Sequence, residues 1–227
     1  MRLRVPWLLW LAAPWLFWVA AAVFLLLTVL VSTGALDGMD EHVLAFCRDH
    51  HNATLHAFGR DLTDVFSPPV DMAVLGVVAG YLAWSRRRLR PFLVAAVVAW
   101  GAAAIVYFTK DWIGRPLPDA PAAPPHGGGF PSGHTAGFLV CFGVLALITT
   151  RRGERSRRVA LAAVAAGTVL IAAMLVYDSF HWLSDTLGSM ALGVALLSLV
   201  HAGVSRRTAS PSSVTDTPPT ARTAHRR

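Results

Sequence analysis

The sequence predicts an all-α, polytopic membrane protein with six transmembrane helices and a helical core. Hydrophobic residues make up 55% of the 227 residues and charged residues only 15%, whereas a soluble domain carries about 25% charged residues. The mean hydropathy is +0.52, and the apolar residues form runs close to the roughly 20 residues that a helix needs to cross a bilayer. We therefore expect one membrane domain over residues 1–207, followed by a short tail.

The apolar runs divide into six candidate spans, of which the second is interrupted near its start by Asp71. The first run exceeds the about 7–15 apolar residues of a signal peptide, and no clear cleavage site follows it, so we expect it to be retained. The expected spans cover approximately residues 5–31, 69–85, 91–109, 134–150, 158–177 and 184–204.

Arginine residues predict the orientation of these spans. They precede the first span, separate the second from the third and the fourth from the fifth, and follow the sixth. Loops enriched in Lys and Arg face the cytoplasm. We therefore expect a multi-pass protein of the cell membrane with both termini in the cytoplasm. The extracytoplasmic side then receives residues 32–68, 110–133 and 178–183.

Two further segments lie outside the spans. Residues 32–68 are acidic and carry apolar residues at helical spacing, among them Leu44, Phe46 and Phe58, which predicts a helix lying on the membrane surface. The tail over residues 208–227 is rich in Ser, Thr and Pro and has no apolar run, so we expect it to be disordered in the cytoplasm.

The net charge of +7 does not indicate a nucleic-acid partner, because the basic residues form short blocks between apolar runs without interleaved aromatic residues. Cys47 and Cys141 are the two cysteines, and Cys141 lies inside an apolar run. A disulfide framework is therefore not expected.

Lys110 opens the second outer segment and is the single lysine of the chain. A lysine at the end of a span can serve as an anchor whose charged end reaches the interface. This chain uses arginine at every other basic position, and arginine would serve as an anchor equally well. We therefore expect Lys110 to have a functional role.

The stretch "PSGH" at residues 131–134 stands where a loop meets the fourth span. Ser132 is suited to cap the helix, but capping requires neither Gly133 nor His134. A helix N-terminus binds anions through free N–H groups and its partial positive charge. Ser132 would add a hydroxyl donor, Gly133 would let an oxyanion approach the backbone, and His134 can exchange a proton near neutral pH.

His181 and Asp185 are four residues apart at the entry to the sixth span, so they share a helix face. A local capping pair would have the same spacing. A carboxylate bonded to one imidazole nitrogen also leaves the other nitrogen free to act as nucleophile or base. Together with Lys110 and the helix start, this pair supplies the groups for metal-independent phosphoryl transfer through a phosphohistidine. We expect no cofactor and no metal.

These motifs resemble the type 2 phosphatidic acid phosphatase (PAP2) family of membrane lipid phosphatases, over about residues 36–200. The family carries K-x6-R-P, P-S-G-H and S-R-x5-H-x3-D. The second motif matches completely at residues 131–134, and "HWLSD" at 181–185 matches the end of the third. The resemblance implies that His181 is the nucleophile, Asp185 its orienting partner and His134 the general acid. It also implies that Lys110 and the backbone at 132–134 bind phosphate.

Two motif arginines are absent. The family's arginine in the first motif falls on Leu117, and the arginine of the third motif falls on Leu175. Arg115–Pro116 stands two residues early, and Arg115 is a candidate to replace one missing guanidinium as a phosphate ligand. His126 is another candidate donor. Asp178, close to the expected site, would repel phosphate, and the pattern does not explain it.

The leading hypothesis is therefore a membrane phosphatase acting on a lipid or polyprenyl phosphate or diphosphate at the outer face. The missing arginines favour a second hypothesis, a PAP2-like membrane protein that binds lipid phosphates but is catalytically weak or inactive. A small transporter is a third possibility, but the spans lack the broken helices and mid-span charges of transporters.

Overall fold

The computed structural model describes residues 14–120, 127–150 and 155–206. Within these ranges the regular secondary structure is entirely helical. The helices are α1 (Pro14–Ser32), α2 (Asp37–Asp49), α3 (Ala53–Val65), α4 (Pro68–Ser85), α5 (Arg90–Ile113), α6 (Gly133–Thr149), α7 (Arg155–Tyr177) and α8 (Leu183–Arg206). Residues 5–13 of the first expected span and the tail at 208–227 lie outside the described residues.

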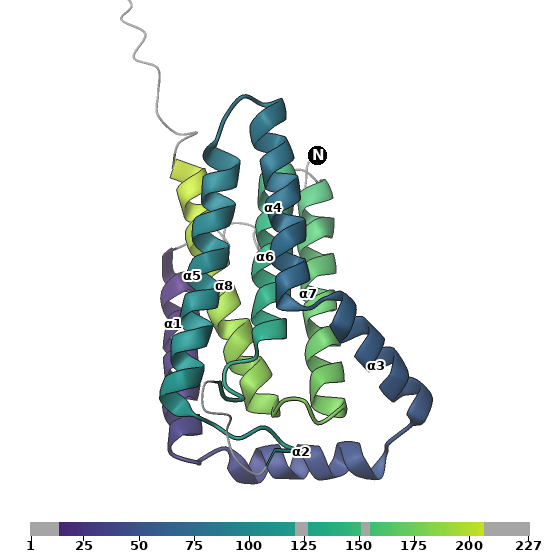
Figure 1. The fold of residues 1–227 in the computed structure, drawn as a ribbon. Coiled ribbons are helices and arrows are strands. Elements are labelled where there is room, and N and C mark those ends of the chain that lie inside the picture. The colour runs from purple at the N-terminus through teal and green to yellow at the C-terminus, as the bar shows by residue number, and fades with distance from the viewer. Residues whose placement is uncertain (1–13, 121–126, 151–154, 207–227) are drawn as a thin grey trace, which may run out of the picture.

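Helix α6 forms the centre of the bundle (Figure 1) and packs against α4, α5, α7 and α8, while α1 packs against α8. Glycines allow α6 and α8 to approach closely. A Cβ at Gly143 of α6 would lie 2.4 Å from Leu197 Cδ1, and one at Gly193 of α8 would lie 2.5 Å from Leu139 Cδ2. Small residues serve the same purpose at helix interfaces in membranes generally.

The outer surface of the bundle is strongly apolar. Large side chains on α4 and α5 are 68–77% exposed, including Trp84, Val97, Trp100 and Trp112. A soluble protein rarely exposes so much contiguous apolar surface, but lipid tails would cover it. Helices α1, α5, α7 and α8 are each long and apolar enough to cross a membrane, and α3 with α4 meets the same criterion as a pair bent by 44°.

The fourth expected span corresponds to α6, which has 17 residues and is a shorter apolar helix than the four that meet the length criterion by themselves. Helices α4 to α8 thus correspond to the second to sixth expected spans with nearly the expected bounds, and the described part of the first span is helical. The expected fold class of a polytopic all-α membrane protein is confirmed.

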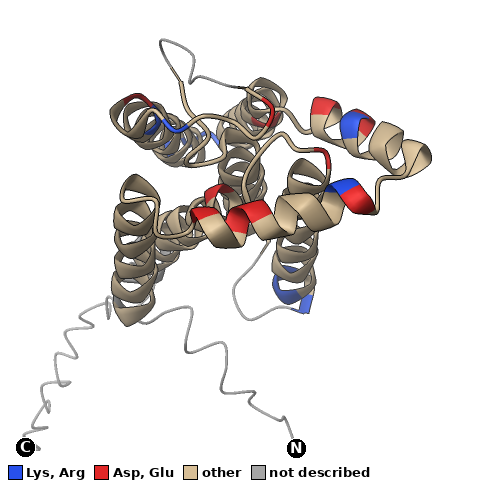
Figure 2. Ribbon diagram, turned by 90° about the horizontal axis from the view of Figure 1, so that it is seen from below, with Lys and Arg blue, Asp and Glu red and all other residues tan. Residues whose placement is uncertain are grey.

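The described residues of the three segments expected on the outer side lie at or near one end of the bundle (Figure 1). Helix α2 crosses this end, and α3 runs obliquely from it to the start of α4. Residues 32–68 thus form two helices rather than one, because the chain breaks at Asn52, whose side chain caps α3 by accepting from Thr54 N at 3.0 Å and Leu55 N at 3.1 Å. Viewed from this end, acidic residues gather along α2 (Figure 2).

Candidate functional site

A cavity of about 500 Å³ opens at the end of the bundle where α2 and α3 lie. Its lining includes Lys110 from α5, Gly133 and His134 from α6, and His181 from the α7–α8 turn. Four of the expected site residues, separated by up to 71 positions in the sequence, therefore share one cavity. Thr63 and Asp64 of α3 form part of the same wall.

The N-terminus of α6 faces this cavity. Ser132 is the N-cap residue, and its hydroxyl accepts from Thr135 N at 3.4 Å. Within the described ranges, no acceptor is found for the backbone N–H groups of Gly133 and His134. Such N–H groups can bind an anion. Ser132 itself is fully buried and is not among the cavity-lining residues, so its hydroxyl serves the helix cap.

Lys110 lies in the last turn of α5, and its ammonium is directed to the glycine-rich loop. Nζ donates to the carbonyl of Gly128 and, at 3.4 Å, to that of Gly129. An ammonium has three N–H donors, so one remains for a ligand. Among the described residues that line the cavity, Lys110 is the one Lys or Arg.

The turn after α7 places His181. The Leu175 carbonyl accepts from the backbone N–H groups of both Phe180 and His181, which folds the chain back under α7. The imidazole Nδ1 lies 3.2 Å from Asp185 Oδ2, and both side chains are buried. A carboxylate only accepts hydrogen bonds, so Nδ1 carries the proton and Nε2 keeps its lone pair.

The electrostatic setting of His181 favours the neutral imidazole. Burial is the strongest influence and lowers the pKa of His181 from its ordinary 6.5. The Asp185 carboxylate raises this pKa, and Lys110 lowers it, but burial prevails. At neutral pH the nitrogen that faces the cavity is therefore unprotonated.

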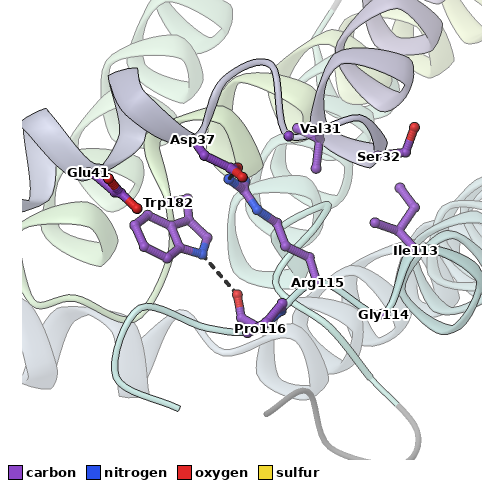
Figure 3. Close-up of a pocket in the computed structure, with 10 residues that line it drawn as sticks. Val31, Ser32, Asp37, Glu41, Ile113, Gly114, Arg115, Pro116 and Trp182 are labelled. Carbon is purple, nitrogen blue, oxygen red and sulfur yellow. Dashed lines mark hydrogen bonds and ion pairs between the residues drawn. The ribbon is translucent and has the colours of Figure 1, made fainter. Parts of the chain in front are cut away.

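Arg115, expected to bind phosphate, has other partners and is not among the residues that line the cavity. Its guanidinium is buried, donating from Nη1 to Asp185 Oδ1 at 2.8 Å and from Nη2 to Asp40 Oδ2 at 2.7 Å. Figure 3 shows Arg115 between Asp37 and Trp182, whose Nε1 donates to the Pro116 carbonyl at 2.8 Å. The geometry therefore gives no support to phosphate binding by Arg115.

The two positions where the family motifs carry arginine do face the cavity. Leu117 and Leu175 both line it. The wall is therefore apolar at the two positions where the complete motifs would place guanidinium groups. The cavity thus contains His181, His134 and the start of α6, but less positive charge than the complete motifs would give.

The carboxylate of Asp178 has a hydrogen-bond partner, His56, which the sequence analysis did not select. Its Oδ1 lies 2.9 Å from His56 Nδ1 of α3, and its side chain is fully buried. The Asp178 side chain does not line the cavity. His126, the other candidate donor, lies outside the described residues.

The sequence reasoning also missed Asp40, which is 1% exposed and contacts both Arg115 and the start of α8. The sequence feature that could have indicated Asp40 is the acidic run at residues 37–41. Its pairing with Arg115 is seen only in the folded structure. In the part of the chain that the structure describes, no group of three or more His, Cys, Asp or Glu is arranged to hold a metal ion.

Comparisons with known proteins support the family and the fold. A sequence model of the PAP2 superfamily matches residues 70–209. The fold is similar to the crystal structure of the first transmembrane PAP2 type phosphatidylglycerolphosphate phosphatase from Bacillus subtilis, with a TM-score of 0.73 and 20% sequence identity. The similarity covers 84% of this chain and 96% of that chain. Among curated proteins, none matches the sequence.

Proposed function

Because this chain belongs to the PAP2 superfamily, we propose that it is an integral-membrane phosphatase that hydrolyses a lipid or polyprenyl phosphate or diphosphate through a phosphohistidine. The observation that carries the proposal is the shared cavity of Lys110, Gly133, His134 and His181. Each of these groups has a role in phosphoryl transfer that needs no group from outside the chain.

In the first step, Nε2 of His181 attacks the phosphorus atom. The bond from phosphorus to the leaving oxygen breaks as the bond to Nε2 forms, and His134 gives its proton to the leaving oxygen. Lys110 and the free N–H groups at the start of α6 stabilise the charge on the equatorial oxygens. Asp185 keeps the Nδ1 proton in place and stabilises the positive charge on the ring.

In the second step, water attacks the phosphohistidine. His134 has lost its proton and now acts as the base that activates this water. The phosphorus–nitrogen bond breaks, phosphate leaves, and both histidines return to their starting protonation states.

An apolar cavity of about 210 Å³ supports a lipid substrate. It lies between α4, α5 and α6, and its walls include Ala102, Val106 and Val140. It shares Pro68, Lys110 and Gly133 with the larger cavity. A hydrocarbon chain could therefore occupy the apolar cavity while its phosphate lies beside His181, an arrangement that a soluble phosphate ester would not require.

The charge distribution supports an extracytoplasmic site. The site lies at the end of the bundle where α2 carries its acidic residues. The arginine-rich turn at residues 86–88 joins α4 and α5 at the opposite end. Loops rich in arginine face the cytoplasm, so we assign the cavity to the outer side.

The proposal is tested with purified protein in detergent, offered phosphatidic acid or a polyprenyl diphosphate. Wild type should release phosphate from at least one of them, and His181→Ala should reduce release to background. His42→Ala, an exposed histidine on α2, is the matched control and should retain activity. A His181→Ala protein as active as wild type would refute the nucleophile assignment. Rapid quenching in alkali should trap a phosphohistidine, which is stable in base and labile in acid.

A second candidate function, binding of lipid phosphates without turnover, is favoured by Leu117 and Leu175 in the cavity wall. It predicts saturable binding of phosphatidic acid vesicles, no phosphate release and no trapped intermediate. The phosphate-release assay therefore distinguishes the two functions directly.

A further inference from the structure

We propose that Arg115 and Asp40 are positioning residues that hold Asp185 against His181, so that the surface helix α2 is part of the catalytic assembly. This inference rests on the proposed function, because it assigns roles in the same reaction. It gives Arg115 a role other than phosphate binding and gives Asp40 a role that the motifs do not contain.

Arg115 bridges the carboxylates of Asp40 and Asp185, which are far apart in the sequence. Nη1 donates to Asp185 Oδ1 at 2.8 Å and to Ser184 Oγ at 2.7 Å. Nη2 donates to Asp40 Oδ2 at 2.7 Å. The guanidinium also lies 5.2 Å from the centre of the Trp182 ring, a favourable cation–π distance. Burial alone would lower the pKa of Arg115, but Asp185 and Asp40 outweigh it and raise this pKa, so the group stays charged.

Asp40 joins α2 to the first turn of α8. Its Oδ1 accepts from Ser184 N at 2.9 Å, and its Oδ2 accepts from Ser184 Oγ as well as from Arg115. The residue is 1% exposed. An acidic side chain at a helix N-terminus satisfies a free N–H group and is favoured by the helix dipole. Asp40 therefore fixes the helix start from which Asp185 projects.

These contacts leave Asp185 a single orientation. Its Oδ1 is held by Arg115, while its Oδ2 accepts from His181 Nδ1 and, at 3.1 Å, from Trp182 N. Rotation of the carboxylate would break contacts on both oxygens at once. The tilt of the His181 ring, and hence the direction of Nε2, thus depends on a guanidinium that does not line the cavity.

The arrangement also has an electrostatic signature. The charged and titratable groups around His181 are Asp185, Lys110, His134, Asp64 and, behind Asp185, Arg115, Asp40 and Asp37. Loss of the Arg115 charge makes the potential at His181 more negative, which stabilises imidazolium and raises its pKa. Loss of the Asp40 charge has the opposite effect. If both residues acted only on folding, without electrostatic coupling to His181, this pKa would not change.

The experiment compares wild type with Arg115→Gln, Arg115→Lys and Asp40→Asn, which conserves the shape of the side chain. The first measurement is the pH dependence of kcat and KM for phosphate release. The second is an NMR titration of ¹³C-labelled histidine in detergent, with the His181 signal assigned from its absence in His181→Ala. The matched controls are Arg48→Gln, which removes an exposed ion pair with Asp119, and Asp49→Asn, an exposed acid on the same helix.

Arg115→Gln should lower kcat by about tenfold or more with little change in KM, since the residue touches Asp185 and not the phosphate. The His181 pKa should rise by roughly 0.5–1 unit in Arg115→Gln, fall in Asp40→Asn and stay near wild type in Arg115→Lys. Both controls should match wild type. A rise in KM without a change in the His181 pKa would instead identify Arg115 as a phosphate ligand and overturn the inference.

Failure of this inference can be told apart from failure of the proposed function. Active wild type whose His181 pKa is the same in Arg115→Gln and Asp40→Asn would refute the positioning roles and leave the phosphatase intact. Conversely, the NMR titration measures how Arg115 and Asp40 affect the His181 pKa even if the protein releases no phosphate.

Discussion

Gly129 packs directly against the carboxylate of Asp185: a Cβ at this position would lie 2.7 Å from Asp185 Oδ2. The carboxylate cannot easily move away, because Arg115 and His181 hold its two oxygens. The backbone on the other side is equally fixed, since Gly129 N donates to the Arg115 carbonyl at 2.8 Å. Gly129 of the "GGGF" stretch is therefore required for steric reasons, because a side chain at this position would collide with the Asp185 carboxylate.

Gly129→Ala should therefore displace Asp185 and misalign His181. We expect kcat/KM to fall by up to about 100-fold, the loss that small misplacements of catalytic groups can cause. Gly101→Ala on α5 is the control, because a Cβ there meets nothing within 4 Å. Full activity in Gly129→Ala would mean that the carboxylate tolerates a shift and that its position matters less than we infer.

Leu117→Arg should strengthen anion binding. Leu117 lines the cavity at a position where the PAP2 motif carries arginine, and Lys110 is the one basic side chain among its described lining residues. A new charge-assisted contact is worth about 1.5–3 kcal/mol, so the Kd for vanadate should fall by about 10–100-fold. The uncharged Leu117→Met should bind vanadate as wild type does. Equal affinity of all three proteins would place residue 117 out of reach of the bound anion.

The activity of wild type should persist below the ordinary titration range of histidine. Burial lowers the pKa of His181 from 6.5, and attack requires the neutral ring, so on the acid side activity is lost when the pH falls through this lowered pKa. The acid limb of kcat/KM should therefore lie below pH 6.5. Because the substrate phosphate also titrates, its pKa should be measured by ³¹P NMR and its ionisation subtracted from the pH profile. An acid limb above 6.5 would contradict neutral His181 as the attacking group.

Vanadate should inhibit phosphate release, because it can form a five-coordinate adduct with His181 that mimics the transition state. EDTA should leave the rate unchanged, since the proposed steps use only side-chain and backbone groups of this chain. Both are measured in the same detergent assay. Loss of activity in EDTA, restored by a divalent cation, would require a different mechanism.

His56→Ala should destabilise the fold. It removes the partner of Asp178 Oδ1, and Asp178 Oδ2 already has no partner within the described residues. A buried polar group that loses its hydrogen-bond partner costs about 1–3 kcal/mol, and the partly exposed His56 side chain places the loss toward the lower end of this range. Thermal unfolding in detergent should show a lower Tm than wild type, whereas His42→Ala should not.

The fold could be predicted because each span is encoded locally. Apolar runs bounded by arginine or proline gave helix limits close to those observed, as in α4 at Pro68–Ser85 against the expected 69–85. The break at Asn52 was not predicted, because the apolar spacing continues on both sides of it. The burial of α6 was not predicted either, since hydropathy does not distinguish a helix surrounded by helices from one surrounded by lipid.

The site could be predicted only in part. Lys110 was selected because it is the single lysine of the chain, and His134 and His181 because they stand beside a helix start and a carboxylate four residues away, respectively. The role of Arg115 could not be read from the sequence, because its partners Asp40 and Asp185 are 75 and 70 positions away. Spacing along the chain carries no information on such a contact. A basic residue near an expected phosphate site is therefore interpreted as a phosphate ligand, as Arg115 was.

The order of the elements along the chain has a consequence for biosynthesis. The described residues that line the cavity begin at Thr63 and end at His181, and Asp185 follows in the first turn of α8. Chains emerge from the ribosome N-terminus first. A nascent chain that has inserted α1 to α7 therefore holds Lys110 and the α6 start but lacks Asp185. Under the proposed mechanism, the site is therefore complete only after α8 has entered the membrane and docked beside α6.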